Sequence, residues 1–377
     1  MAENKKPAIR FKGFTDAWEQ RELGEIATEI IAGGDVDKSL LCEEGNCPVI
    51  ANALTNDGII GYYKNEYRVK APAVTVTGRG DVGHAKARND DFTPVVRLLS
   101  VKSEHDIYFL ENAINAIKIV VESTGVPQLT VPQLSKNVVF YPNSAEEEMK
   151  IGTYFRNLDH LITLHQRKYD KLVKVKKSML EKMFPKNGSK FPEIRFKGFT
   201  DAWEQRKVKE MCSISTGKSN TQDKIDDGIY PFYVRSPIIE RSNKYLYDEE
   251  AVLTVGDGVG TGKVFHYVNG KYDLHQRCYR MYDFSDELDA KYFYHVFSYL
   301  FYKRVMAMTA KTSVDSVRLE MISNMKIPTP CIKEQRTIGQ CLTNLDTLIT
   351  LHQRKLEKLK NIKKLVLKRC LYQEVSV

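Results

Sequence analysis

The chain carries an internal duplication. Residues 9–21, IRFKGFTDAWEQR, recur without a change as residues 194–206. In addition, LDHLITLHQRK at residues 158–168 matches LDTLITLHQRK at residues 345–355. Because nearly the same period relates both pairs, the sequence predicts two copies of one unit of about 186 residues.

Between these repeated blocks the two copies differ in sequence, yet both predict the same order of elements. A short apolar strand comes first, followed by an alternating strand that ends in glycines, a third strand, a helix and a closing strand. These elements are predicted at residues 48–51, 73–80, 95–101, 106–121 and 137–141, and again at residues 230–234, 251–258, 277–282, 289–306 and 324–327. A fold that is kept while its side chains diverge is typical of a recognition module whose target differs between copies.

A long amphipathic helix is predicted after each module. The segments from residues 146 and 333 show a heptad a/d pattern for more than four heptads. The polar residues in the two seams are His165 and Lys176, with their repeats His352 and Lys363. The lysines either fix the register of a helix pair or extend their amines to solvent, and both roles stay open. The predicted pairing residues are Ile151, Phe155, Leu158, Ile162, Tyr169, Leu172, Ile338, Leu342, Leu345, Ile349, Leu356 and Leu359.

The order of the segments favours an antiparallel pair. Pro185 and Gly188 end the first helix, and a module of about 145 residues precedes the second. Two units joined head to tail are related by a two-fold axis if these helices run antiparallel. At ~1.5 Å per residue, a helix of about 39 residues is ~55 to 60 Å long. The alternative, in which each helix packs only across its own module, stays open.

The predicted fold class is therefore α+β. Two mixed α/β modules stand in tandem, separated by two long helices that pair as a pseudo-two-fold symmetric antiparallel coiled coil. The predicted boundaries are residues 1–145 for the first module, 146–185 for the first spacer helix, 186–332 for the second module and 333–377 for the second spacer helix. With 377 residues, 42% of them apolar, each module is long enough to bury its own core.

Charge and composition narrow the class of partner. Lysine and arginine outnumber aspartate and glutamate 57 to 48, and the resulting net charge of +9 favours polyanions. Residues 146–184 and 333–373 carry about +10 together, enough to leave a share for the backbone of DNA. No apolar run approaches ~18 residues and residues 1–10 lack a signal-peptide core, so we expect a cytoplasmic protein away from membranes. Seven cysteines without C-x-x-C spacing predict reduced thiols and no zinc site.

Glycine-rich segments in both copies invite a comparison with nucleotide-binding loops. GRGDVG at residues 78–83 satisfies G-x-G-x-x-G, but no apolar helical stripe follows it. GDGVGTGK at residues 256–263 resembles a Walker loop, but Asp257 and Val264 stand where glycine and serine or threonine are required. We interpret both segments as tight turns after a strand, which let backbone amides and nearby cations approach phosphate.

No catalytic centre is predicted. The chain lacks the Asn-Pro-Pro-aromatic and Asp-Pro-Pro-Tyr loops of DNA methyltransferases, and it lacks the H-E-x-x-H, G-x-S-x-G and zinc-deaminase patterns. Tyrosines stand beside arginines in the second module, where most should be core residues and the rest are candidates to enter a DNA groove. From charge and loop location, the candidate DNA contacts are Arg79, Lys86, Arg88, Lys218, Arg235 and Lys263.

These features together resemble the specificity subunit of a type I restriction-modification system. The resemblance covers essentially the whole chain and includes the alternation of two variable modules with two near-identical helices. Trp18 and Trp203 lie at matched positions in the repeat, and the long helices open with E-x-x-x-I-G at residues 147–152 and 334–339. The most specific piece is EQRTIG in the second copy, whereas the first copy reads EEMKIG.

The resemblance implies a DNA address without catalysis. Each module would be a target-recognition domain that reads one half of a bipartite asymmetric site in double-stranded DNA, and the helix pair would set the unread gap. Two methyltransferase subunits using S-adenosylmethionine and two restriction subunits using ATP and Mg²⁺ would bind, while this chain binds no cofactor and no metal. Modules ~34 to 36 Å apart would leave a gap of about five to eight base pairs. A stand-alone nucleic-acid-modifying enzyme and a protein-binding coiled-coil scaffold are the alternatives.

Overall fold

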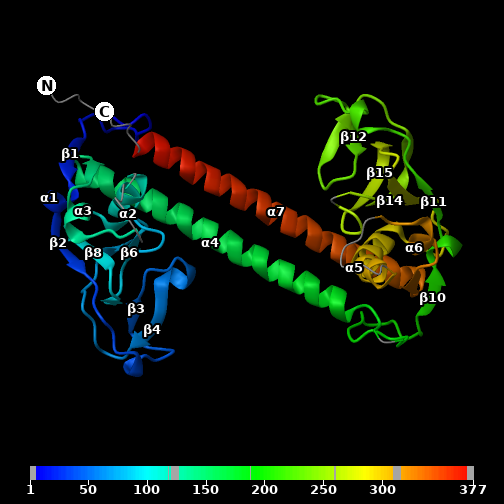
Figure 1. Ribbon diagram of the computed structural model, residues 1–377, viewed down its shortest axis with the longest axis horizontal. Coiled ribbons are helices and arrows are strands. Elements are labelled where there is room, and N and C mark those ends of the chain that lie inside the picture. Colours follow the sequence, from blue (N-terminus) through cyan, green and yellow to red (C-terminus); the bar gives the residue numbers. More distant parts are fainter. Residues whose placement is uncertain are drawn as a thin grey trace. The chain divides into compact units, whose positions relative to one another are not determined.

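The computed structural model describes residues 6–117, 119, 127–186, 188–258, 260–308 and 316–371. It divides into two compact units, and each is described by itself. Unit 1 comprises residues 1–166 and 354–377, and unit 2 comprises residues 167–353. Each unit therefore contains one module together with a segment from each long helix, α4 (Ala145–Lys182) and α7 (Ile332–Cys370) (Figure 1).

The module of unit 1 is built on short antiparallel strands. Its strands are β1 Glu19–Glu22, β2 Ala27–Ala32, β3 Cys47–Ile50, β4 Ile59–Tyr63, β5 Ala73–Thr77, β6 Ala85–Arg88, β7 Thr93–Pro94, β8 Leu98–Ser103 and β9 Val138–Tyr141. A four-stranded antiparallel sheet has the order β2-β8-β5-β6, and a second sheet has the order β4-β3-β7 with β3 and β7 parallel. β1 pairs with β9. The module's helices are α1 Leu23–Ile26, α2 Ile107–Ala116 and α3 Val131–Ser135, with 3-10 turns at Lys38–Leu40 and Thr55–Gly58.

The module of unit 2 has the same plan with longer strands. Its strands are β10 Glu204–Lys207, β11 Ser213–Thr216, β12 Tyr230–Tyr233, β13 Ile239–Ser242, β14 Tyr247–Val255, β15 Phe265–Leu274, β16 Cys278–Tyr282 and β17 Lys326–Thr329. One sheet has the order β11-β16-β14-β15-β12-β13, in which only β12 and β15 are parallel, and β10 pairs with β17. The helices are α5 Ala290–Met308 and α6 Leu319–Ser323, with 3-10 turns at Val208–Glu210 and Thr221–Asp223.

The predicted order of elements is present in both units. The strand–strand–strand–helix–strand series is β3, β5, β8, α2 and β9 in unit 1, and β12, β14, β16, α5 and β17 in unit 2. The boundaries differ at several places. β17, predicted at residues 324–327, spans Lys326–Thr329. Residues 95–97 form a turn before β8 rather than its first residues, because the Leu98 amide donates to the Val95 carbonyl. β14 begins at Tyr247, earlier than predicted, and the predicted end of the first module helix at residues 118–121 lies mostly outside the described residues.

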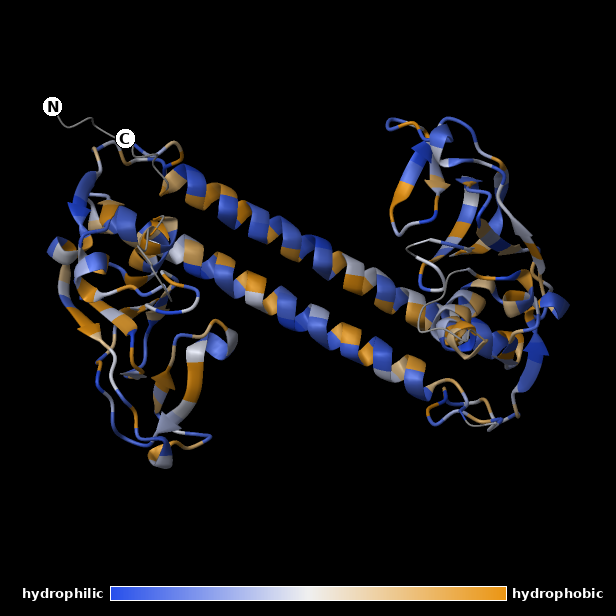
Figure 2. Ribbon diagram, in the orientation of Figure 1, coloured by the Kyte–Doolittle hydropathy of each residue, from blue (hydrophilic) through white to orange (hydrophobic). Residues whose placement is uncertain are grey.

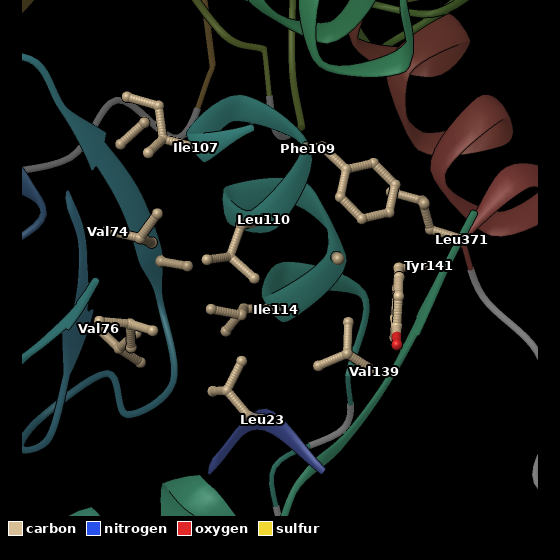
Figure 3. Close-up of a cluster of buried hydrophobic side chains, with 14 of the residues drawn as sticks. Leu23, Val74, Val76, Ile107, Phe109, Leu110, Ile114, Val139, Tyr141 and Leu371 are labelled. Carbon is tan, nitrogen blue, oxygen red and sulfur yellow. The ribbon is translucent and has the colours of Figure 1, made fainter. Parts of the chain in front are cut away.

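The core of unit 1 forms where α2 packs between the strands. Leu110 and Ile114 of α2 lie near Val74 and Val76 of β5, on one side, as Figure 3 shows. On its other side lie the β9 residues and Leu371, which follows α7. Burial of this apolar surface, at about 25 cal/mol per Å², is the main source of stability here. In unit 2, α5 fills the same place with a stack of aromatic rings, in which Phe297 and Phe301 lie 4.5 Å apart.

The repeated Trp segments, residues 9–21 and 194–206, fasten each module to its long helix. In unit 1 the Arg10 guanidinium pairs with the buried carboxylate of Glu147 of α4. In unit 2 Arg195 makes the same pair with Glu334 of α7. Breaking a buried ion pair on one side is costly, so these identical segments have a structural role as anchors.

The E-x-x-x-I-G openings act at the same junction. Beside each glutamate, Glu148 in unit 1 and Gln335 in unit 2 accept the N-cap amides of Asp106 and Asp289. A Cβ atom on Gly152 would lie 2.9 Å from the Phe109 nitrogen, and one on Gly339 would lie 2.8 Å from the Tyr292 nitrogen. Glycine is therefore required where the long helix crosses the first turn of the module helix. The residues compared at this junction are Asp106, Phe109, Glu148, Gly152, Asp289, Tyr292, Gln335 and Gly339.

Segments of α4 and α7 pair within each unit, and they run antiparallel. In unit 1, Ile151 and Phe155 of α4 line one pocket with Val366 and Cys370 of α7, while Asp159 pairs with Lys363 further along. Figure 2 shows apolar residues recurring along both helices between hydrophilic ones. All twelve predicted pairing residues are buried or half-buried, so the heptad pattern marks the inward face of each helix.

The two open alternatives for the helices are both partly realised. Ile151, Phe155 and Leu158 belong to the core of their own module and also contact α7, so helix pairing and packing on the module use one continuous surface. Lys176 and Lys363 do not simply extend to solvent, because each forms an ion pair with an aspartate of the other helix. A charged pair at matched positions sets the register of both contacts.

Unit 1 contains an apolar pocket of about 200 Å³. It lies between the Trp segment, α4 and α7, and its walls include Tyr154, Val366 and Cys370. Unit 2 carries Met179 and Met183 at the positions of Val366 and Cys370, and Met183 is buried in the core. These methionine side chains are larger than the valine and the cysteine at the matched positions of unit 1.

Candidate nucleic-acid interface

A short turn occupies the same place in both modules. Residues 95–97 of unit 1 and 275–277 of unit 2 lie directly before β8 and β16. In each sheet this strand is the neighbour of β5 or β14, which we call the central strand. Matched backbone hydrogen bonds hold the two turns. They are Leu98 N to Val95 O and Cys278 N to His275 O, both 2.9 Å, then Gly33 N to Leu98 O at 2.7 Å and Gly217 N to Cys278 O at 3.1 Å.

The ends of neighbouring strands meet this turn in the same way in both units. The amides of Val95 and His275 donate to the last strand residues of β3 and β12. The glycine after the central strand accepts an amide from the segment before α3 or α6. The matched bonds are Val95 N to Ile50 O at 2.8 Å, His275 N to Tyr233 O at 2.9 Å, Leu129 N to Gly78 O at 2.9 Å and Val317 N to Gly256 O at 2.7 Å. The two modules thus share one backbone framework although their side chains differ.

Two glycines make this framework possible. A Cβ atom on Gly78 would lie 2.1 Å from the carbonyl oxygen of Arg97, and one on Gly256 would lie 2.5 Å from that of Arg277. No side chain fits at such distances, so the turn backbone packs directly on the glycine that ends the central strand. The glycine turns predicted from the sequence therefore have a packing function, and they lead into strands β6 and β15.

The surface around the turn in unit 1 is polar, and we call it the strand-end surface of unit 1. Its residues are Asn52, Arg79, Val96, Arg97 and Gln128. The Asn52 side chain accepts from Gly78 N at 2.8 Å and donates to Val96 O at 3.0 Å. The Arg97 guanidinium donates to the Gln128 side chain at 2.8 Å, and Arg79 is exposed. Polar residues from four separate segments therefore lie around one turn.

The corresponding strand-end surface of unit 2 has different side chains on the same positions. Its residues are Arg235, Asp257, Gln276, Arg277 and Ser316. Asp257 carries a carboxylate 3.4 Å from Arg235 and 3.8 Å from Arg277. Arg277 keeps 66% of its side-chain surface exposed.

The arginines of unit 2 also act on the histidine of the turn. The pKa of His275 is lowered, first by its burial and then by the positive charge of Arg235. Its Nδ1 atom accepts from the Arg277 amide at 3.0 Å, which fits the neutral imidazole.

The six predicted DNA contacts fall into two groups. Arg79 and Arg235 belong to the strand-end surfaces. The Lys218 side chain is exposed, and the backbone amide of Lys218 donates to Leu274 O, beside the turn of unit 2. Lys263 is exposed before β15, with its amine 4.8 Å from the centre of the Tyr302 ring. Both lysines, like the arginines, have side chains that reach solvent.

Lys86 and Arg88 lie on β6, away from the turn. Lys86 is exposed, with its amine 3.9 Å from the Asp57 carboxylate. Arg88 donates to Thr75 and to the Asp57 carbonyl, and burial lowers its pKa. The guanidinium of Arg88 thus serves the internal structure of the module, because its bonding groups are already used inside it.

Sequence reasoning did not select Asn52, Arg97 and Gln128, and it noted Arg277 only among the arginines of the tyrosine-rich module. The signal that identifies Arg97 and Arg277 was present, since V-R-L and Q-R-C both stand directly before the third strand. Asn52 and Gln128 gave no such signal, because only the tertiary fold brings their segments to the turn.

Other classes of site find no support in the described part of the chain. No three His, Cys, Asp or Glu side chains there gather to share a metal ion. None of its helices combines the length and apolar composition that crossing a membrane requires. All seven cysteines are free thiols.

A family model and curated relatives that match this chain all describe type I specificity proteins. The sequence model of a family described as type I restriction modification DNA specificity domain matches residues 15–174 and, again, residues 200–361. Over 296 residues the chain is 24% identical to the type I restriction enzyme MjaVIII specificity subunit of Methanocaldococcus jannaschii, covering 72% of this chain and 69% of that protein. Over 132 residues it is 29% identical to the putative type I specificity subunit S.MpnORF507P of Mycoplasma pneumoniae, covering 34% of this chain and 36% of that protein.

A solved structure resembles the whole chain. The crystal structure of the type I restriction-modification system S subunit from M. genitalium matches with a TM-score of 0.79 at 14% identity, covering 98% of this chain and 100% of that one. At this identity the match establishes the fold alone.

Proposed function

The chain belongs to the type I restriction-modification DNA specificity family, and from this premise we propose that each of its modules reads one half of a bipartite, asymmetric DNA site through its strand-end surface. One observation carries the proposal: four matched backbone hydrogen bonds hold a turn at the same place in both modules, but different side chains surround it. A common framework with exchanged polar groups suits two readers with two different targets.

The exchanged residues have the chemistry that base reading needs. Gln128 carries both a donor and an acceptor, which suit the paired acceptor and donor of adenine in the major groove, whereas the amide of Asn52 bonds to Gly78 N and Val96 O and supports the turn. Arg235 offers a fork of donors that suits the two acceptors of guanine. Arg79 of unit 1 corresponds to Asp257 of unit 2, so the sign of the charge at this position is reversed between the modules. Two different half-sites follow from two different sets of donors and acceptors.

The proposal assigns no catalysis to this chain. Methylation of adenine in each half-site belongs to two partner methyltransferase subunits that use S-adenosylmethionine. Cleavage belongs to two restriction subunits that use ATP and Mg²⁺. This division of labour comes from the family resemblance, and the assembly supplies the cofactors.

The long helices set the gap between the half-sites under this proposal. Matched ion pairs, Asp159 with Lys363 in unit 1 and Asp346 with Lys176 in unit 2, support a fixed register. We expect the unread gap to be about five to eight base pairs. Insertion of one heptad into α4 alone should abolish methylation of the parental site, while matched insertions in α4 and α7 should lengthen the gap.

Exposed leucines on the repeated segment of the long helices, residues 158–168 and 345–355, support docking of two copies of one partner. Leu161 and Leu164 of α4 are 41% and 38% exposed, and their repeats Leu348 and Leu351 of α7 are 42% and 45% exposed. Identical apolar side chains at the surface of both units suit one kind of partner surface bound twice. Changing Leu161 and Leu164 to serine should weaken capture of the methyltransferase without lowering stability. The matched control is Leu365→Ser, which alters an exposed leucine outside the repeated block.

Genome-wide mapping of methylated adenine tests the function directly. Cells with the gene should show a two-part motif that is absent from cells without it. Exchanging Asn52 and Arg79 for their unit 2 counterparts should alter only one half of the motif. Identical maps with and without the gene would reject the proposal. DNA methylation by the purified chain alone would favour a stand-alone enzyme, and binding to proteins but never to DNA would favour a scaffold.

A further inference from the structure

One charged residue is the same in both strand-end surfaces. Arg97 and Arg277 both stand at the last position of the turn, and each has its carbonyl oxygen against the glycine that ends the central strand. The neighbours change around them, from Asn52 to Arg235, from Arg79 to Asp257 and from Gln128 to Ser316. The arginine is therefore the same in both units, while three neighbouring positions differ. These positions hold Asn52, Arg79 and Gln128 in unit 1 and Arg235, Asp257 and Ser316 in unit 2.

Resting on the proposed function, we infer that Arg97 and Arg277 bind a backbone phosphate at the equivalent place in each half-site. Two readers of different sequences share only one kind of DNA group at every position, the sugar-phosphate backbone. A contact kept while the reading residues change therefore belongs to phosphate. The contact positions the module on the duplex and carries no base information of its own.

The chemistry of the two arginines fits this role. A guanidinium presents parallel donors that match two phosphate oxygens, and it stays charged at any physiological pH. Arg277 is the more accessible, with 66% of its side-chain surface exposed and a carboxylate at 3.8 Å as its partner in the free protein. Arg97 is half-buried and donates to Gln128 instead. In both units a polar neighbour orients the guanidinium before DNA arrives.

Close packing and backbone hydrogen bonds hold the turn that carries each arginine. Its backbone lies against Gly78 or Gly256, its first amide donates to the last residue of β3 or β12, and a hydrogen bond closes it onto β8 or β16. Arg97 has a positive φ of 69° and Arg277 does not, so the two turns differ in backbone conformation at the arginine, but the arginine occupies the same position before the strand and against the glycine in both modules. The readers around it then meet base edges in a constant frame, which is what exchange of the variable residues requires.

Salt-dependent binding with the full chain in complex with its methyltransferase tests the inference. Arg97→Gln and Arg277→Gln are compared with wild type on a duplex carrying the mapped site and on an unrelated duplex. Each variant should bind both duplexes about tenfold more weakly near 0.1 M salt, and the slope of log K against log salt should fall by about one. The map of methylated adenine should keep its sequence, at lower occupancy.

Matched controls separate charge from position. Lys136→Gln, at the C-cap of α3, and Lys326→Gln, at the beginning of β17, each remove one exposed cation from a module, outside the turn. They should leave the affinity and the slope unchanged. Arg97→Lys and Arg277→Lys keep the charge but lose the paired donors, so they should recover part of the affinity and nearly all of the slope.

Two results would overturn the inference while leaving the proposed function intact. One is an Arg277→Gln complex that accepts a different base at one position and binds unrelated DNA as tightly as wild type, since that is the behaviour of a base reader. The other is an unchanged slope in correctly folded variants. A wild-type complex without any sequence preference would instead remove the proposed function, and the inference with it.

Discussion

Lys363 of α7 donates to both carboxylate oxygens of Asp159 of α4, at 2.6 and 2.8 Å. In the other copy of the repeat, the same pair recurs between Asp346 of α7 and Lys176 of α4. Each pair lies inside its own unit, with the lysine and the aspartate about a quarter to a third exposed. The duplication therefore preserved an ionic contact together with the apolar seam, and this contact exists only if the helix segments run antiparallel.

Charge reversal tests this pairing. Asp159→Lys places two lysines together and should lower the free energy of unfolding by about 1 kcal/mol, as should Lys363→Asp. The double variant restores an opposite pair, so it should recover most of that loss in a double-mutant cycle measured by urea unfolding. Glu146→Lys, which breaks an exposed pair within α4, is the control and should cost about 0.5 kcal/mol. Strictly additive effects of the two reversals would contradict the contact.

The glycine under the turn gives a second prediction. Gly78→Ala introduces a Cβ atom 2.1 Å from the Arg97 carbonyl oxygen, so the backbone must move and stability should fall by about 1 to 3 kcal/mol. Gly61→Ala is the matched control, because its new Cβ atom would meet first the flexible tip of Leu41, at 3.1 Å. Chemical unfolding of both variants decides the point. Equal small losses would show that the turn does not depend on this close approach.

The pocket of unit 1 gives a third prediction. Cys370→Met installs the residue that unit 2 carries at this position, Met183, and should fill the pocket and stabilise unit 1 by about 1 kcal/mol. The reverse change, Met183→Cys, should open a cavity in unit 2 and cost about 1 to 3 kcal/mol. Thermal unfolding measures both. A destabilised Cys370→Met protein would mean that the pocket is narrower than a methionine side chain.

A buried histidine predicts acid sensitivity of unit 2. Burial lowers the pKa of His295 to about 3, and the positive charge of Lys176 adds to the effect, while the Asp346 carboxylate lies at 3.8 Å. Below about pH 6.5 this histidine binds a proton in the unfolded state but stays neutral in the folded state. The stability contributed by the neutral ring is therefore complete above pH 6.5 and is lost as the pH falls toward 3, by about 1.4 kcal/mol per pH unit.

His295→Asn is the matched variant, since Asn112 is the corresponding buried residue of α2 in unit 1. Unfolding free energies between pH 4 and 7 should converge for the wild type and the variant as the pH decreases. A difference that stays constant over this range would show that His295 titrates normally in the folded protein.

Much of this architecture follows from the sequence alone, because its signals are local. A heptad pattern identifies the inward face of a helix without its partner, and all twelve predicted pairing residues are indeed buried or half-buried. Alternation and glycine spacing located four strands and one helix of each module to within about five residues, whereas other strands, among them β2, β6, β11 and β15, were not predicted. The exact repeat of the Trp segment identified the duplication, although its anchoring role through Arg10 and Glu147 needed coordinates.

Only the tertiary structure decided which polar side chains share a surface. Asn52, Arg79, Arg97 and Gln128 come from four segments that are well separated in the sequence, and strand pairing alone brings them to one turn. For the same reason charge could not distinguish Arg79, which faces solvent, from Arg88, whose guanidinium is bonded inside the module. Sequence periodicity records which face of an element is buried, whereas the meeting of strand ends depends on long-range contacts that no local pattern encodes.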